Sequence, residues 1–167
     1  MLYTSSEANK LLRKLKDERE NVLNIERQSS IFNSALGENP ETVRPEYDYT
    51  KTQTELDELE KKIRIIKLAI SQFNLSHNVP EFNMTICELL IYIPQLSQRK
   101  SKLYSMANRL PKARENNYRG LNIVDYCIAN YDIKKARADY SVISDELSKA
   151  QTALDIINNS IKFEIDL

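Results

Sequence analysis

Positively charged side chains gather in one part of a chain whose formal net charge is zero. Residues 91–120 hold seven Lys and Arg residues and one acidic residue, a net charge of +6. The segments on either side, residues 1–90 and 121–167, each carry a net charge of −3. Arginine forks match phosphate oxygens, lysine adds a point charge, and tyrosine rings stack on flat groups. The basic segment also contains Tyr92, Tyr104 and Tyr118, so its chemistry points to an anionic ligand.

The basic segment is therefore the candidate ligand site. The candidate anion-binding residues are Arg99, Lys102, Tyr104, Arg109, Lys112, Arg114, Tyr118 and Arg119. We expect a phosphate-bearing small ligand, such as a signalling nucleotide, and sequestration is a role that would fit. The alternative is a solvated basic face, neutralised by acidic residues elsewhere in the chain or on a neighbouring subunit.

Two further classes of function compete with small-ligand binding. One is a structural scaffold whose apolar helix seams recruit a protein partner. The other is a helical hairpin that lies along an RNA backbone through its basic residues. The zero net charge and the isoelectric point near 6.6 count against RNA, because dedicated nucleic-acid-binding domains are usually basic overall.

Several other chemistries lack the residues they need, since the chain has 2 Gly, 1 His and 2 Cys. Gly37 and Gly120 cannot build a glycine-rich phosphate loop, and His77 alone cannot supply a multi-histidine zinc site. A dyad of Cys87 with His77 is conceivable, but no third group is recognisable to orient it. A small buried side chain is the simpler interpretation of Cys87. We therefore expect a protein that is not an enzyme and that has no metal and no cofactor.

Four helices should position the basic segment. Apolar residues recur at alternating spacings of three and four, which is typical of amphipathic helices with coiled-coil seams. The pattern predicts helices over residues 5–32, 50–74, 86–110 and 133–161. Between and after them we expect a linker over 33–49, a loop or strand over 112–131 and an extended end over 162–167. Ile25 and Leu110 are among the expected seam positions.

The predicted helix ends carry recognisable signals. Thr85 and Glu88 have the spacing of a capping box, so the third helix should begin at Ile86. The expected caps of the first and fourth helices are Ser5 or Ser6 and Asp132, respectively. Pro94 should kink the third helix or split off its first part.

These elements predict an all-α fold, an elongated four-helix bundle with heptad seams that spans residues 1–167 as a single domain. A small two-stranded β element that pairs residues 121–131 with 162–167 would lie beside it. The fourth helix should be about 30 residues, or roughly 45 Å, long. One partner of ordinary length does not cover such a helix, so we expect a homo-oligomer. The first helix would pack either on its own chain or on a neighbour's.

The order of features over residues 50–160 resembles a known family. In sequence, these features are a charged, leucine-seamed helix ending at Asn74, a short Pro-containing turn, the Thr85–Ile86–x–Glu88 motif, then Leu96, Arg99 and Leu103, and a closing amphipathic helix. In these features the chain resembles the septicolysin-like family of small bacterial helical proteins. The resemblance implies a helical fold and a bacterial or phage origin.

No targeting or membrane-spanning segment is recognisable. The first ten residues contain no apolar stretch of the kind found in signal peptides. The longest strongly apolar run, Leu89 to Ile93, is far shorter than the about 20 residues needed to cross a bilayer. Two lone cysteines fit a reducing compartment. We therefore expect a cytoplasmic protein with no membrane partner.

Overall fold

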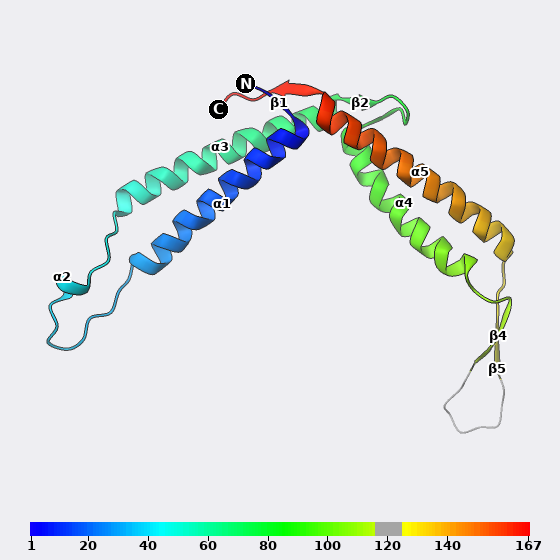
Figure 1. Ribbon diagram of the computed structural model, residues 1–167, viewed down its shortest axis with the longest axis horizontal. Coiled ribbons are helices and arrows are strands. Elements are labelled where there is room, and N and C mark those ends of the chain that lie inside the picture. The colour runs from blue at the N-terminus through cyan, green and yellow to red at the C-terminus, as the bar shows by residue number, and fades with distance from the viewer. Residues whose placement is uncertain (116–124) are drawn as a thin grey trace. The chain divides into compact units, whose positions relative to one another are not determined.

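The computed structural model describes residues 1–115 and 125–167, which form two compact units. Unit 1 contains residues 1–76 and 157–167, and unit 2 contains residues 77–156. The described residues are mainly helical (Figure 1), which confirms that part of the prediction. The helices are α1 (Ser5–Ser29), α2 (Pro40–Val43), α3 (Tyr49–Ser76), α4 (Ile86–Ala107) and α5 (Ile133–Ser160). The strands are β1 (Leu2–Thr4), β2 (Asn78–Val79), β3 (Met84–Thr85), β4 (Lys112–Glu115), β5 (Asp125–Ile128) and β6 (Lys162–Glu164).

The strands form two-stranded antiparallel sheets, and the expected pairing of residues 121–131 with 162–167 is wrong. Of these ranges, β5 pairs with β4, and β6 pairs with β1. The reason is α5, which separates β5 from β6 in the chain. Its 28 residues extend about 42 Å, so each strand pairs with a partner at its own end of this helix. The remaining sheet is the short β2–β3 hairpin that precedes α4.

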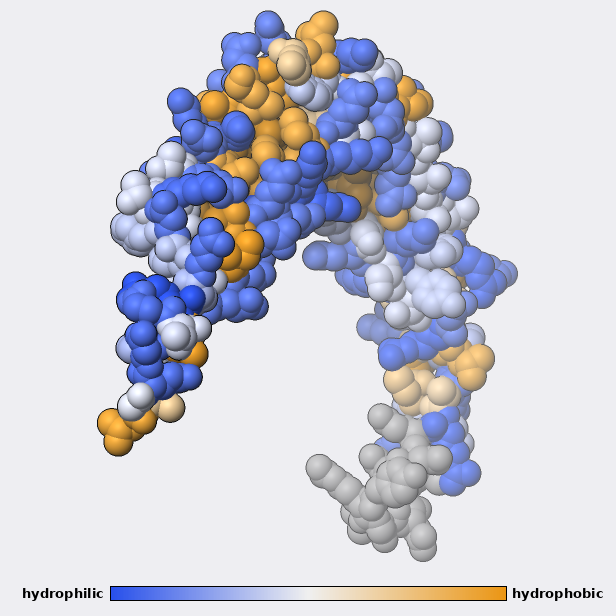
Figure 2. Space-filling view, turned by 60° about the vertical axis from the view of Figure 1, so that its left-hand side comes forward, coloured by the Kyte–Doolittle hydropathy of each residue, from blue (hydrophilic) through white to orange (hydrophobic). Residues whose placement is uncertain are grey.

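Unit 1 is built around α1 and α3, which lie side by side and antiparallel within the same chain (Figure 1). The buried members of its core are Ala8, Leu12, Leu15, Leu59, Ile63, Ile66 and Ile165. In a pair of helices, each helix shields the apolar residues of the other only where the two face each other. Figure 2 shows apolar side chains that remain visible in a strip along this pair. Full burial on α1 ends at Leu15, Val22 is partly buried against the same core, and the expected seam residue Ile25 is 59% exposed.

Both ends of the chain are fixed to the core of unit 1. The ring of Phe163 in β6 stacks on Phe73 of α3, with the ring centroids 4.5 Å apart. Ile165 is only 1% exposed, although it stands near the C-terminus. The amino group of Met1 donates a hydrogen bond to the carbonyl of Ile165 at 2.9 Å. The β1–β6 sheet thus closes the end of the α1–α3 pair.

Unit 2 is built around α4 and the part of α5 that precedes Ile157. The hydroxyl of Tyr92 on α4 donates a hydrogen bond to the Glu146 carboxylate on α5 at 2.6 Å. The buried apolar residues of the two helices in this unit are Ile86, Leu89, Leu96, Ala107, Ala136, Ile143, Leu147, Ala150 and Ala153. Leu110, an expected seam residue, lies beyond the end of α4 and is 65% exposed.

The start of α1 differs from the prediction by one residue. Thr4, not Ser5 or Ser6, is the N-cap, and its side chain accepts a hydrogen bond from the Glu7 N–H. The Glu7 carboxylate accepts in return from the Thr4 N–H at 2.8 Å, which completes a capping box. The two serines therefore belong to the first turn of the helix.

The starts of α4 and α5 are as predicted. Thr85 and Glu88 form a capping box, and the Asp132 carboxylate accepts from the N–H groups of Lys134 and Lys135. Helix α4 continues through Pro94 without splitting. Proline cannot donate to the carbonyl four residues earlier, that of Leu90, and Leu90 is 44% exposed, so water can reach this part of the helix. None of the helices in the described ranges is long and apolar enough to cross a membrane.

Candidate anion-binding sites

The predicted basic segment is distributed over a helix, its end and a strand. Arg99, Lys102 and Tyr104 lie on α4, Arg109 lies just after it, and Lys112 and Arg114 lie on β4. All six side chains are exposed. Tyr118 and Arg119 fall outside the described residues. Tyr104 also contacts α5, because its ring centroid lies 5.7 Å from that of Tyr140.

The end of α4 is held by two side chains from the beginning of α5 and the turn before it. The Tyr131 hydroxyl donates to the carbonyl of Met106 at 3.0 Å, and the Arg137 guanidinium donates to the carbonyl of Ala107 at 3.3 Å. The last carbonyls of a helix lack partners within the helix, and a cation is favourable there. These two bonds fix the point from which the chain continues toward β4.

Lys112 and Arg114 share one face of the β4–β5 hairpin with Tyr126 and Ile128. The register pairs Lys112 with Ile128 and Arg114 with Tyr126, and directly paired residues point to the same side of a sheet. All four side chains are exposed, Tyr126 by 51% and Ile128 by 66%. The ammonium nitrogen of Lys112 lies 4.1 Å from the centroid of the Tyr126 ring. We call these four residues the hairpin face.

The hairpin face carries positive charge that the described chain does not neutralise. No described carboxylate lies within 4 Å of the charged nitrogens of Lys112 or Arg114. The ring of Tyr126 attracts the Lys112 ammonium through its electron-rich face, which leaves the charge in place. The hairpin face thus offers two cations and one aromatic ring to an anionic ligand.

Tyr126 is missing from the site predicted from sequence, which ends at residue 119. The alternation of Tyr126 and Ile128 along the chain indicates that these two residues share a face of a strand. That face gains its cations only through the register with β4. No local pattern in the sequence specifies this register.

Neither Cys87 nor His77 belongs to the predicted basic segment or to the hairpin face. Cys87 is half-buried at the start of α4 and its thiol is free. The backbone carbonyl of His77 accepts a hydrogen bond from the Ile86 N–H at 2.9 Å, which ties the β2–β3 hairpin to α4. Within residues 1–115 and 125–167, no group of three or more His, Cys, Asp or Glu residues is placed to hold a metal ion.

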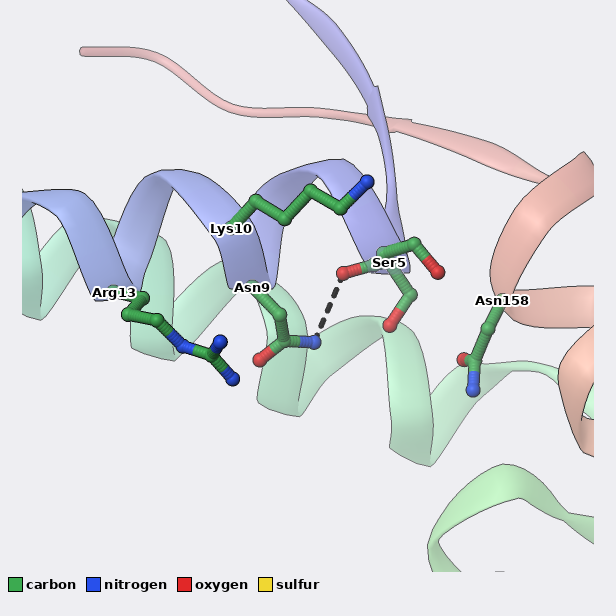
Figure 3. A pocket seen from close by; sticks show the side chains of 6 residues that line it. Ser5, Asn9, Lys10, Arg13 and Asn158 are labelled. Atoms are coloured by element: carbon green, nitrogen blue, oxygen red, sulfur yellow. Dashed lines mark hydrogen bonds between the residues drawn. The ribbon is translucent and has the colours of Figure 1, made fainter.

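A polar pocket in unit 1 contains two cations that the sequence-based site does not include. Its volume is about 290 Å³, and its lining residues are Ser5, Ser6, Asn9, Lys10, Arg13 and Asn158 (Figure 3). The Asn9 amide donates to the backbone carbonyl of Ser5 at 2.9 Å, and the Ser6 hydroxyl donates to the Asn159 amide oxygen at 2.7 Å. These bonds use polar groups that a ligand would otherwise engage. Lys10 and Arg13 remain as the charged groups of the pocket.

The positive charge of this pocket could have been found in the sequence as a cluster of basic residues. Residues 10–16 hold four basic residues and no acidic one. The net charge counted over residues 1–90 does not reveal this cluster, because 15 acidic residues lie in the same range. Helix α1 therefore carries positive charge that is as local as the charge of the predicted basic segment.

Comparison with known proteins supports the fold alone. No protein-family model matches the chain, and no curated protein matches it. Among solved structures, the chain is similar to the crystal structure of a functionally unknown conserved protein from Corynebacterium diphtheriae. The TM-score is 0.66, and the match covers 98% of this chain and 100% of that one at 16% sequence identity. The two proteins thus share a fold.

Proposed function

We propose that this protein is a non-catalytic helical binding protein that holds a phosphate-bearing small molecule on its hairpin face. The observation that supports the proposal is the position of Lys112 and Arg114 beside the exposed ring of Tyr126, with no described carboxylate near either cation. Lysine and arginine recognise phosphate, and an exposed ring adds a stacking surface. The ligand class that matches all three side chains is the nucleotide.

The rest of the basic segment supports the same ligand class. Arg99 and Lys102 are exposed on α4 and add two positive charges to unit 2. Lys112 now lies over the ring of Tyr126, and it would turn toward a phosphate when a base stacks on that ring. Binding of this kind, without a reaction, lowers the free concentration of the nucleotide, which is a sequestering role.

Isothermal titration calorimetry with mononucleotides, dinucleotides and cyclic nucleotides tests this proposal. The variant Lys112→Ala/Arg114→Ala should bind at least about tenfold more weakly, because a charge-assisted hydrogen bond contributes roughly 1.5–3 kcal/mol. Tyr126→Ala should weaken binding of nucleotides but not of inorganic phosphate, since only nucleotides stack. The control Lys61→Ala/Lys62→Ala removes the same charge from exposed positions of α3. Equal affinity of the hairpin double variant and the wild type for every nucleotide would overturn the proposal.

A scaffold that self-associates is the second candidate function, and apolar exposure in unit 1 supports it. Leu68 and Leu75 stand one heptad apart on α3 and are 60% and 63% exposed, and Ile25 on α1 is 59% exposed. Helix pairs from two chains could cover such residues by packing against each other, which would form an intermolecular bundle. Sedimentation equilibrium should then show a dimer that Leu68→Glu/Leu75→Glu dissociates. A monomer at every concentration would contradict the scaffold.

A further inference from the structure

We infer that a groove between α1 and α3 is a separate anion site, and that it takes a compact molecule with two or more linked phosphate groups. The groove lies within unit 1 and has a volume of about 540 Å³. Its lining residues are Lys16, Arg19 and Glu20 from α1 and Glu60, Ile63, Arg64 and Lys67 from α3. The groove shares no residue with the hairpin face, so binding at the groove can be tested independently of the proposed function.

The carboxylates of the groove already have partners. The Arg19 Nε and Nη2 atoms both lie 2.8 Å from the Glu60 Oε1 atom, which makes a link between α1 and α3. Glu20 accepts a hydrogen bond from the Arg27 guanidinium at 3.0 Å, and Arg27 stands outside the groove. The two acidic side chains are therefore matched by two arginines.

Three cations of the groove are left without an acidic partner. No described carboxylate lies within 4 Å of the charged nitrogens of Lys16, Arg64 or Lys67. Glu20 and Glu60 each stand four residues from one of these cations, Lys16 and Arg64 respectively, at the spacing of helix ion pairs. Each carboxylate pairs with a different arginine instead, so positive charge accumulates around the groove.

The arrangement of these three cations favours a polyanion. The cations come from two helices and line the same groove, so a single phosphate group would leave part of their charge unmatched. Linked phosphate groups can reach both helices. Ile63 is 8% exposed and contributes an apolar wall, beside which charge–charge attraction is stronger than in open water. Among the described residues, none that lines the groove is aromatic, so it recognises phosphates and not a base.

Calorimetric titration of the full chain with sodium tripolyphosphate, sodium pyrophosphate and sodium orthophosphate tests this inference. We expect the wild type to bind tripolyphosphate and pyrophosphate more tightly than orthophosphate at about 0.15 M salt. Arg64→Ala/Lys67→Ala should weaken tripolyphosphate binding about tenfold or more. Both residues are exposed, so the variant should fold, and its melting temperature without phosphate checks this. Tripolyphosphate should raise the melting temperature of the wild type but not of this variant.

Two matched variants decide where tripolyphosphate binds. Lys61→Ala/Lys62→Ala makes the same change of charge on the same helix outside the groove and should bind like the wild type. Equal weakening in both α3 variants would overturn the site, since it would mean attraction to the overall charge of the helix. A loss confined to Lys112→Ala/Arg114→Ala would overturn it as well, because tripolyphosphate would then bind the hairpin face. The absence of any binding by the wild type at about millimolar tripolyphosphate would also overturn the site.

Discussion

At the scale of the residue, the hydrogen bond between Tyr92 and Glu146 joins the side chains of the two long helices of unit 2. The Tyr92 hydroxyl donates to Glu146 at 2.6 Å, and this bond, followed by partial burial, raises the pKa of Tyr92. The phenol therefore keeps its proton, and the bond, throughout the neutral range. Tyr92→Phe should lower the free energy of unfolding by about 1 kcal/mol, measured by urea denaturation. Tyr104→Phe is the control and should change it little, because its hydroxyl forms no hydrogen bond in the described structure.

A second residue-scale prediction concerns the C-terminus, which in most proteins contributes little to stability. Here Ile165 is 1% exposed and belongs to the core of unit 1, whereas Leu167, two residues later, is 53% exposed. Ile165→Ala should cost roughly 2–5 kcal/mol of unfolding free energy in urea denaturation. Leu167→Ala should stay within about 0.5 kcal/mol of the wild type. Similar effects of the two substitutions would mean that β6 does not pack on this core.

The sequence predicts which side of each helix is apolar, but not how far along the helix a partner covers it. Ala8, Ile63 and Ile66 follow the expected seams and are buried. Ile25 and Leu110 follow the same spacing and are exposed, because packing on α1 weakens after Val22 and α4 ends at Ala107. The spacing of apolar residues is a property of one helix, whereas the burial of a residue depends on both helices of a packed pair.

At the scale of the element, the capping boxes of α1 and α4 should make stability depend on pH. Hydrogen bonds from the backbone N–H groups and side chains of Thr4 and Thr85 lower the pKa of Glu7 and Glu88 below the ordinary value of 4.5. A carboxylate with a lowered folded-state pKa stabilises the fold above its unfolded-state pKa. That contribution is lost as the pH falls through the folded-state value.

Glu7→Gln/Glu88→Gln should therefore lose less stability than the wild type between about pH 5 and pH 3. Glutamine can still accept the hydrogen bond of a capping box but does not titrate. Urea denaturation at both pH values checks this expectation. Glu81→Gln is the control, since Glu81 stands in the exposed turn between β2 and β3, and it should keep the wild-type dependence on pH. Equal losses in all three proteins would mean that other carboxylates dominate the acid response.

Elements with local signals could be predicted, and those that depend on distant partners could not. The capping box at Thr85 and Glu88 is complete within four residues, and it marks the start of α4 correctly. The strand character of residues 125–128 and 162–164 is also visible in the sequence, but their pairing is not. Pairing depends on which strands the 28-residue helix α5 keeps apart. The same limit applies to the hairpin face and to the α1–α3 groove, because each combines residues from two elements.

At the scale of the whole molecule, the chain consists of two units, each built on a pair of helices. The shared fold with the Corynebacterium diphtheriae protein persists at 16% identity. Helical pairs tolerate such divergence because a core needs apolar side chains of suitable size at the seam positions, and many sequences supply them. Surface cations such as Lys16 and Arg114 are not constrained by the fold in this way. The proposed functions therefore have to be tested on this chain itself.

Native mass spectrometry of the protein freshly purified from cells tests the central claim, that the chain binds a phosphate-bearing small molecule without catalysis. We predict a mass above an integral number of chains, an excess that is lost on denaturation, and phosphate in the fragments of the released molecule. The same spectrum counts the chains in the assembly. A spectrum of chains without bound ligand, both directly from cells and after incubation with nucleotides and with tripolyphosphate, would show that the protein does not bind such a molecule.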